Sequence, residues 1–176
     1  MSAKLNETKT IYKGRVFTLA SDNITLPNGV TTGIDIIRHP GAAAIVPMLN
    51  KNTVLLVKQY RYAAGGFIWE IPAGTLNPGE SPIECAKREL VEETGYSADK
   101  LEKLTEIVPV PGYSDERIHL YLATGLVKAV QKLDKDEMLN VHEINMNDAL
   151  KMIAKGEIID SKTISGLYLA SIKAAS

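Results

Sequence analysis

The sequence predicts a mixed α/β fold in which a sheet is flanked by helices. Three observations indicate this class: short β-like segments separated by turns near the start, apolar runs of strand length in the middle, and helical patterns in the centre and at the end. No repeat, low-complexity tract or linker divides the chain. Its 176 residues suffice for one domain with a buried core.

The first forty residues are predicted to form a small antiparallel β unit. Their β-like segments, separated by turns such as the PNG sequence, are 10–20, 21–26 and 31–39. We therefore assign residues 1–40 to an N-terminal β unit and residues 41–176 to the main domain.

The main domain begins with apolar runs that are typical of buried strands. These runs, AAAIVPML, TVLLVKQYR and FIWEIPAG, occupy residues 42–49, 53–61 and 67–74. A short NKN turn joins the first two, and the flexible AAGG sequence precedes the third. We expect all three strands to enter one sheet.

The next segment carries both the start and the stop signals of a helix. Ser81 is a suitable N-cap, Pro82 suits the first helical position, and Glu84 completes a capping box. Gly95 supplies a C-terminal stop that tolerates positive φ. The residues on the expected core-facing arc are Ile83, Ala86 and Leu90.

The remainder of the chain predicts three further strands and two helices. The strand patterns are at 101–110, 117–126 and 137–144, with PGYSDE as a loop between the first two. The first helix is predicted near 147–155, where Gly156 stops it, and the second from about Ser161 to the end.

Charge and composition exclude several classes of function. Lys and Arg number 20 against 21 Asp and Glu, so the net charge of −1 offers no basic excess for nucleic acid or an anionic membrane. No apolar run approaches a membrane span, and the first residues lack the apolar segment of a signal peptide. The single cysteine, Cys85, permits no internal disulfide. We expect its side chain to contribute to the packing of the helix, because the nearby Glu84 and Glu89 disfavour a reactive thiol. We expect a soluble, cytoplasmic protein.

Three glutamates fall at i, i+3 and i+4 near the C-terminal end of the central helix: Glu89, Glu92 and Glu93. Like charges at this spacing cost roughly a few tenths of a kcal/mol per pair, and the helix macrodipole also disfavours them there. One interpretation is a solvated acidic face softened by Lys87 and Arg88. The other is a divalent cation site, because Mg²⁺ takes oxygen ligands and turns both penalties into attraction.

The full spacing around these glutamates favours the cation site. It resembles the Nudix box, a signature whose fixed glycine and charged positions are filled here by Gly74, Glu80, Arg88, Glu89, Glu92, Glu93 and Gly95. Tyr96 departs from the pattern, which prefers an aliphatic residue there. The resemblance implies the Nudix fold, a mixed sheet between helices, and a hydrolase that splits diphosphate linkages with Mg²⁺, for which Mn²⁺ can substitute.

The sequences that flank the box resemble the ADP-ribose pyrophosphatase branch of this family. The resemblance rests on KQYR and WEIPAG before the box and on PGYSDE after it, and it extends to the turn-rich start and the GEIIDSKTISGLYLA tail. In this branch the proline after the box is a marker, which corresponds to Pro111. We place Pro111 and Gly112 in the substrate site, although a proline–glycine pair is also an ordinary turn.

The expected metal ligands come first from the helix. Glu89 and Glu93 lie one turn apart on one face and are the first choice for direct ligands. The resemblance adds the main-chain carbonyl of Ala73, and Glu92 as a further or water-mediated ligand. It also implies that Glu80 and Arg88 brace the loop and helix, with Glu80 near the outer metal shell. For Arg88, a structural ion pair is favoured over direct catalysis.

The general base is left open between several acids. In this branch it comes from a loop after the box, and the residues that qualify are Glu137, Asp136, Asp134 and, secondarily, Glu116. Glu137 fits best by its register with the following strand. Lys135, however, stands where another acid is expected, and a solvated loop is the alternative for all four.

Two arginines are candidates for binding the substrate phosphates. Arg61, in KQYR, matches a substrate-contacting arginine of the family, and Arg38 is a weaker candidate of the same kind. Glu70 is the obvious partner for Arg61. The N-terminal unit offers only Tyr12 and Phe17 as aromatic faces, so the preference for adenine is open.

Three functions are carried forward from the sequence. The first is Mg²⁺-dependent hydrolysis of ADP-ribose to AMP and ribose 5-phosphate, and the second is a broader hydrolase of nucleoside diphosphate sugars such as ADP-glucose or GDP-mannose. The third is a non-catalytic regulator that binds ADP-ribose. The resemblance also implies a homodimer, in which the N-terminal strands of one subunit complete the substrate pocket of the other.

Overall fold

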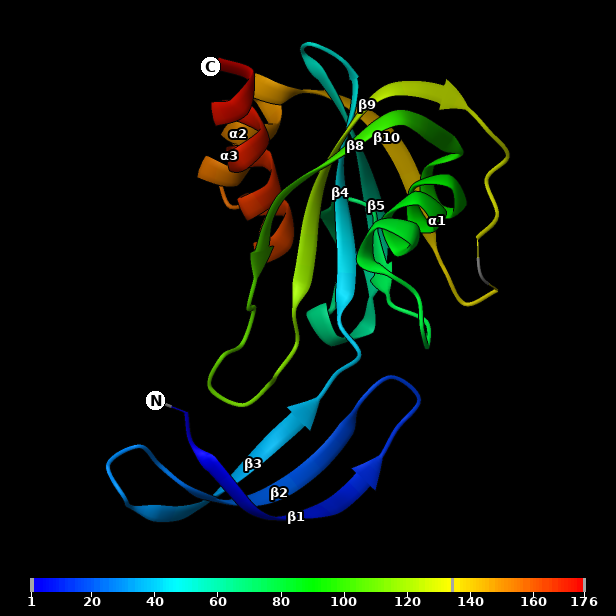
Figure 1. The fold of residues 1–176 in the computed structure, drawn as a ribbon. Helices are drawn as coiled ribbons and strands as arrows, with labels where there is room; N and C mark the ends of the chain where they lie inside the picture. The colour runs from blue at the N-terminus through cyan, green and yellow to red at the C-terminus, as the bar shows by residue number, and fades with distance from the viewer. Residues whose placement is uncertain (1, 134, 176) are drawn as a thin grey trace. The chain divides into compact units, whose positions relative to one another are not determined.

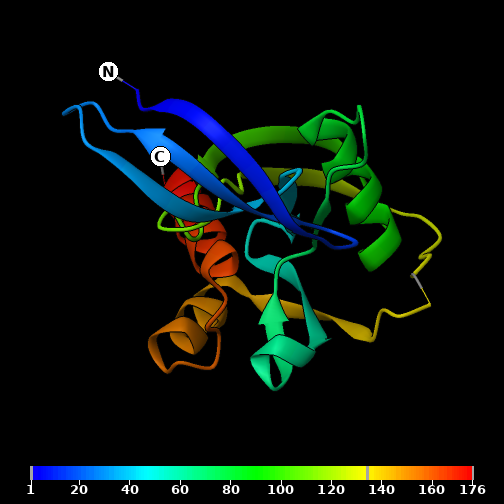
Figure 2. The same cartoon turned by 90° about the horizontal axis from the view of Figure 1, so that it is seen from below.

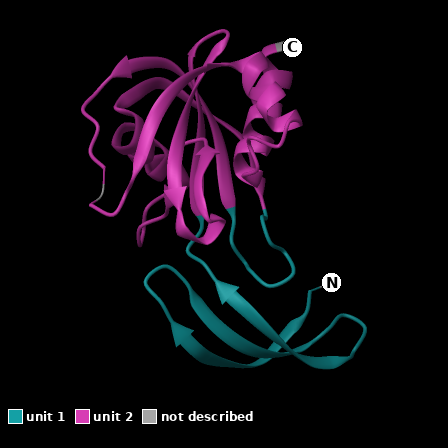
Figure 3. Ribbon diagram, turned by 180° about the vertical axis from the view of Figure 1, so that it is seen from behind, with its two compact units in different colours: residues 1–41, 108–117 teal, residues 42–107, 118–176 magenta. Residues whose placement is uncertain are grey.

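The computed structural model describes residues 2–133 and 135–175. The chain folds as two compact units, which are coloured separately in Figure 3. Unit 1 consists of residues 1–41 and 108–117, and unit 2 consists of residues 42–107 and 118–176. No helix in the described part of the chain is long and apolar enough to cross a membrane.

Unit 1 is a three-stranded antiparallel sheet. Its strands are β1 (Lys4–Lys13), β2 (Thr18–Thr25) and β3 (Thr31–Arg38), in the spatial order β1-β2-β3. The sequence interpretation of one segment over 10–20 and a second over 21–26 is wrong. The chain instead turns between Gly14, whose N–H donates to the carbonyl of Phe17 at 2.9 Å, and β2, which runs unbroken through residues 20 and 21.

The segment 108–117 joins unit 1 through the end of β3. Ile37 donates its N–H to the carbonyl of Tyr113 at 2.8 Å, and Asp115 donates its N–H to the carbonyl of Ile37 at 3.1 Å. The Asp115 carboxylate also accepts from the N–H of His39 at 2.8 Å. These contacts join residues more than seventy positions apart, which explains why local sequence patterns did not reveal them.

Unit 2 is built on a seven-stranded sheet, which is mixed, as the resemblance to the Nudix fold implied. The sequence predicted six strands here, because residues 67–74, expected as one strand, form two strands that pair with different neighbours. The main path runs β10-β5-β4-β9-β8, while β6 pairs with β5 and β7 pairs with β4. Only the β4–β9 pair of this path is parallel among the described pairings. The strands are β4 (Ala42–Asn50), β5 (Thr53–Arg61), β6 (Gly66–Glu70), β7 (Ala73–Thr75), β8 (Tyr96–Ile107), β9 (Ile118–Lys128) and β10 (Leu139–Asn145).

Helices cover both faces of the unit 2 sheet. Helix α1 (Pro82–Thr94) lies on one face, and α2 (Met146–Ala154) and α3 (Ser161–Ala175) lie on the other (Figure 1). The view from below shows the same separation (Figure 2). A short 3₁₀ turn, η1 (Tyr62–Ala64), connects β5 to β6.

The central strand β4 is buried because both of its faces are covered. Its residues Ala44 and Val46 join the core beneath α2 and α3, whereas Ala43 and Ile45 join the core beneath α1. A strand covered on both sides is expected to be an almost continuous apolar run, which is what AAAIVPML is. The strand therefore forms a fixed base for the segments that pack on either side.

Helix α1 begins and ends where the sequence predicted. The Glu84 carboxylate accepts from the N–H of Ser81 at 3.0 Å and from its hydroxyl at 2.6 Å, and Gly95 ends the helix at φ 71°. The predicted core arc is wrong in one position, because Ile83 is 39% exposed. Cys85 joins Ala86 and Leu90 in the core beneath α1 instead.

Candidate functional site

Two of the three clustered glutamates of α1 are buried. Glu93 is 1% exposed and Glu89 is 7% exposed, whereas the side chain of Glu92 is 40% exposed. The interpretation of a solvated acidic face is therefore wrong for Glu89 and Glu93. These carboxylates face the protein interior, where negative charge is costly unless it is compensated.

The carboxylate of Glu93 has little compensation. It accepts one long hydrogen bond, from the N–H of Ala73 at 3.4 Å. Burial raises its pKa well above the ordinary value, and the charges of Glu89 and Glu137 raise it further, while Arg61 lowers it. A divalent cation would remove this repulsion and stabilise the ionised form.

Glu89 packs directly against Gly74 on β7. A Cβ atom at Gly74 would lie 1.7 Å from Oε1 of Glu89, so any other side chain there would displace this carboxylate. Burial raises the pKa of Glu89, and Arg88 opposes this rise. The glycine thus lets a charged side chain of α1 lie against the main chain that follows Ala73.

Arg88 holds the remaining acids of the helix in place. Its Nε and Nη2 each donate to Glu80 at 2.8 Å, and Nη2 also donates to the carbonyl of Thr75 at 3.2 Å. Its Nη1 donates to Glu89, and to Glu92 at 3.0 Å. The Arg88 guanidinium lowers the pKa of Glu80 to about 2. Arg88 thus links Glu80, which precedes the helix, to Glu89 and Glu92 on the helix.

Arg61 and Glu70 form a second charged group in unit 2. Nε and Nη2 of Arg61 lie 2.9 and 2.8 Å from Oε2 of Glu70, which is 3% exposed. The side chain of Arg61 is 41% exposed. The predicted pair is therefore present, with part of the guanidinium open to solvent.

Among the candidates for the general base, Glu137 has an electrostatic link to the buried acids. Its charge raises the pKa of both Glu89 and Glu93. Asp136 lies in the turn that precedes β10, and Asp134 lies outside the described residues. The fourth candidate, Glu116, belongs to unit 1, where its Oε1 lies 3.6 Å from Nδ1 of His39.

The other candidates of unit 1 also lie around the end of β3 and the 108–117 segment. Arg38 donates to Asp22, which is 3% exposed, and to Asp115 at 3.1 Å. Pro111 and Gly112 are part of a turn in which Tyr113 donates its N–H to the carbonyl of Val110 at 3.3 Å. Arg38 is thus held by two acids that the sequence did not single out.

The acids of α1 supply the type of donor that a divalent cation binds. Carboxylate and carbonyl oxygens from Glu89, Glu92, Glu93 and Ala73 match the preference of hard cations, and the excess negative charge at Glu93 fits a cation. Within residues 2–133 and 135–175, no group of three or more His, Cys, Asp or Glu has its ligand atoms already gathered. The side chains of Glu89 and Glu92 contact Arg88 instead.

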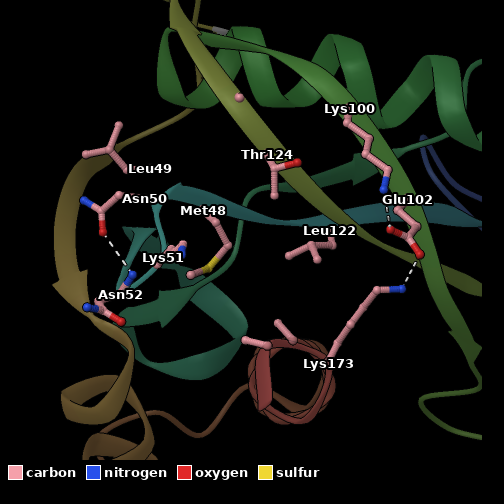
Figure 4. Close-up of a pocket in the computed structure, with 13 residues that line it drawn as sticks. Met48, Leu49, Asn50, Lys51, Asn52, Lys100, Glu102, Leu122, Thr124 and Lys173 are labelled. Atoms are coloured by element: carbon pink, nitrogen blue, oxygen red, sulfur yellow. Dashed lines mark hydrogen bonds and ion pairs between the residues drawn. The ribbon is translucent and has the colours of Figure 1, made fainter. Parts of the chain in front are cut away.

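A cavity of about 700 Å³ lies elsewhere in unit 2 (Figure 4). It is lined by the β4–β5 turn, by β8 and β9, and by the last turns of α3. At its edge, Lys100 and Lys173 both contact Glu102 (Figure 4). None of the candidate site residues lines it, so the buried acids belong to a different part of the unit.

The comparison with protein families identifies the chain. A model described as the NUDIX domain matches residues 38–165. This chain belongs to the Nudix family. A solved structure titled as an ADP compounds hydrolase supports the fold, with a TM-score of 0.85 and 22% identity over 99% of this chain and 95% of that chain.

Curated relatives match this Nudix protein over most of its length. A methanol dehydrogenase activator of Bacillus methanolicus is 42% identical over 98% of this chain and 94% of its own length. An ADP-ribose pyrophosphatase of Bacillus subtilis is 40% identical over 94% and 90%. A GDP-mannose pyrophosphatase of Yersinia enterocolitica is 38% identical over 89% and 85%.

The sequence analysis did not single out Lys162, which contacts the candidate residue Glu70. This lysine is 9% exposed and lies 2.8 Å from Glu70 and 3.0 Å from Asp160. The available signal was the position of a lysine two residues after Asp160, in the first turn of a helix, where the macrodipole disfavours positive charge.

The buried acids predict how stability depends on pH when the protein is kept in chelator. Because the folded pKa of Glu93 is raised, the folded state binds more protons than the unfolded state between the ordinary and the raised pKa. The free energy of unfolding therefore falls as the pH rises through this window. Denaturant unfolding between about pH 5 and pH 8 should show this fall, and the fall should be smaller in Glu93→Gln. Parallel pH profiles for the two proteins would contradict the account.

Gly74→Ala should displace Glu89, because the added methyl group overlaps the carboxylate. We expect a loss of about 1–3 kcal/mol in the free energy of unfolding and a weakened binding of Mn²⁺, measured by denaturant unfolding and by metal titration. Gly33→Ala is the matched control, since nothing lies within 4 Å of its Cβ position. A Gly74→Ala variant that matches this control would refute the steric role of Gly74.

Proposed function

We propose that this Nudix protein hydrolyses the diphosphate linkage of ADP-ribose to give AMP and ribose 5-phosphate, with Mg²⁺ as the cofactor and Mn²⁺ as a possible substitute. The observation that carries the proposal is the burial of Glu93 beside Glu89 with little compensating positive charge. A bound divalent cation neutralises diphosphate oxygens and lowers the pKa of a bound water, which is the chemistry that this hydrolysis requires.

In this proposal the residues of unit 2 have distinct roles. Glu89, Glu93 and the carbonyl of Ala73 bind the cation, with Glu92 as a further or water-mediated ligand and Glu80 in the outer shell. Arg61 donates charge-assisted hydrogen bonds to the phosphates, and its exposed edge supports this role. Arg88 positions Glu89 and Glu80 and does not react. Glu70 orients Arg61.

Glu137 is the proposed general base, because it fits best by its register with the following strand and its charge raises the pKa of both buried glutamates. Asp134, Asp136 and Glu116 are the remaining candidates for this role. From unit 1, we propose that Arg38, Pro111 and Gly112 contribute to substrate binding, on the strength of the subfamily resemblance.

The names of the relatives support a nucleoside diphosphate compound as the substrate. They also support two alternative functions, a broader hydrolase and a regulator. The Bacillus subtilis relative is named for ADP-ribose, and the Yersinia enterocolitica relative for GDP-mannose, so a broader hydrolase of nucleoside diphosphate sugars is the second candidate. The Bacillus methanolicus relative is named as an activator of another enzyme. This name gives weight to a regulatory role, with or without catalysis.

A substrate panel separates these functions. ADP-ribose, ADP-glucose, GDP-mannose and a nucleoside triphosphate are each incubated with Mg²⁺ or with chelator, and the products are resolved by chromatography. Release of AMP from ADP-ribose alone supports the narrow function, and comparable cleavage of the sugars supports the broad one. Binding of ADP-ribose without cleavage would overturn the hydrolase and favour a regulator.

Glu93→Gln should reduce kcat by about a hundredfold or more without unfolding the protein, because it removes a ligand charge and relieves a buried one. Circular dichroism and the kcat for ADP-ribose with saturating Mg²⁺ provide the measurement. Lys87→Gln, on an exposed side chain of the same helix, is the control. Near-normal turnover in Glu93→Gln would refute the metal site.

We further propose a homodimer that acts in the cytoplasm. Unit 1 exposes large apolar side chains that a partner subunit could cover, among them Leu5, Ile11, Tyr12 and Phe17. The single cysteine and the lack of a charge excess agree with a reducing compartment and with small-molecule substrates.

Deleting residues 1–40 should yield a monomer with little activity, because the N-terminal strands would provide both the dimer interface and part of the substrate pocket. Light scattering after size-exclusion chromatography and the turnover of ADP-ribose test this expectation. A truncated protein that remains an active dimer would contradict the proposed role of the N-terminal strands.

A further inference from the structure

Lys162, on the first turn of α3, is a buried lysine with an unusual position. It is 9% exposed, and a positive charge there suffers both from desolvation and from the helix macrodipole. Its Nζ lies 3.0 Å from Asp160, the acid next to the helix start, and 2.8 Å from Oε1 of Glu70, ninety-two residues earlier in the chain. The contact with Glu70 thus joins α3 to the end of β6.

Glu70 is held by two cations on its two oxygens. Lys162 contacts Oε1, whereas Nε and Nη2 of Arg61 contact Oε2 at 2.9 and 2.8 Å. The terminal torsion of a glutamate is otherwise broad. By binding Oε1, Lys162 fixes the plane of the Glu70 carboxylate. The position of Oε2, and therefore the orientation of the bound Arg61 guanidinium, is fixed as well.

Arg61 also interacts electrostatically with Glu93. Its positive charge lowers the pKa of Glu93, whereas burial raises it. A guanidinium released by Glu70 would be drawn toward this poorly compensated carboxylate, where a cation is expected. Its hydrogen bonds to Glu70 involve Nε and Nη2, so the Nη1 edge is the part turned away from that pair. A fixed Glu70 therefore keeps Arg61 separate from the acids and presents one edge to the substrate.

The same turn of α3 also fixes the main chain next to Glu70. The hydroxyl of Thr163 accepts from the N–H of Ile71 at 2.8 Å and donates to Asp160 at 2.5 Å, and Asp160 accepts from the N–H of Thr163 at 3.0 Å. Thr163 and Ile71 are fully buried. The main chain of Glu70 is thus held by Thr163, which leaves the orientation of its carboxylate to Lys162.

We propose that Lys162 is a positioning residue for substrate binding, which acts through Glu70 to hold Arg61 toward the diphosphate. This inference rests on the proposed function, in which Arg61 binds the phosphates. An ion pair that only fastened α3 to the sheet would change stability but would not act selectively on substrate binding through Arg61.

The experiment compares kcat and KM for ADP-ribose with Mg²⁺ in the full chain and in Lys162→Met, which keeps most of the unbranched side chain but removes the ammonium group. We expect KM to rise by about tenfold with a much smaller change in kcat. Lys162→Arg should restore most of the binding. Lys151→Met is the matched control, because Lys151 pairs with Asp148 at 2.8 Å on the surface of α2 and is 69% exposed; its KM should not change.

A double variant tests whether the effect passes through Arg61. Arg61→Lys alone should raise KM, and adding Lys162→Met should raise it little further, because both changes remove the same interaction. If Lys162→Met does not fold, Lys162→Gln, which keeps a hydrogen-bond donor near Glu70, takes its place in both comparisons.

The outcomes separate this inference from the function on which it rests. If KM is unchanged in Lys162→Met but raised in Arg61→Lys, the inference is overturned and the proposed hydrolase function stands. Additive effects on KM in the double variant would have the same meaning. A wild-type chain that cleaves no diphosphate would overturn the proposed function. In that case the Kd for ADP-ribose, from calorimetry, replaces KM in the same comparisons and still decides the role of Lys162.

Discussion

The candidate site depends on the burial of one carboxylate, that of Glu93, against the main chain at Ala73. Burying an ionised group costs free energy unless a partner compensates for it. Here the hydrogen bond from Ala73 is long at 3.4 Å, and Glu89 and Glu137 add repulsion. In the proposed function, a divalent cation bound at this point would turn the unfavourable charge of the folded chain into binding energy.

The surrounding fold keeps these acids from relieving the repulsion by moving apart. Gly74 leaves just enough room for Glu89, and Arg88 binds Glu80 with two nitrogens while it also contacts Glu89 and Glu92. The strand that carries Ala73 and Gly74 pairs with the buried β4. A site held by packed elements of this kind is more precise than one built on loops. Because both faces of β4 are covered, β4 is packed into the core and provides a rigid support for the strand that carries Ala73 and Gly74.

Local signals in the sequence predicted most of unit 2. Helix α1 was predictable because Ser81, Pro82, Glu84 and Gly95 act within a few residues of one another, and the spacing of the box located the acids. Burial was not predictable in the same way. Ile83 was expected to lie in the core and is exposed, whereas the burial of Glu93 was left open between a solvated acidic face and a cation site. The packing of residues 108–117 on β3 and the contact of Lys162 with Glu70 depend on pairs far apart in sequence, and no local pattern encodes such pairs.

The central claim is that the buried acids of α1 form a divalent cation site, and direct binding of Mn²⁺ tests it without any assumption about the substrate. Electron paramagnetic resonance of the free ion, during titration into the full chain, measures the bound fraction. The account predicts saturable binding that is lost in Glu93→Gln, where the buried charge is removed, and only weakened in Glu92→Gln, where the carboxylate is exposed. Binding of equal strength in wild type and Glu93→Gln would contradict it.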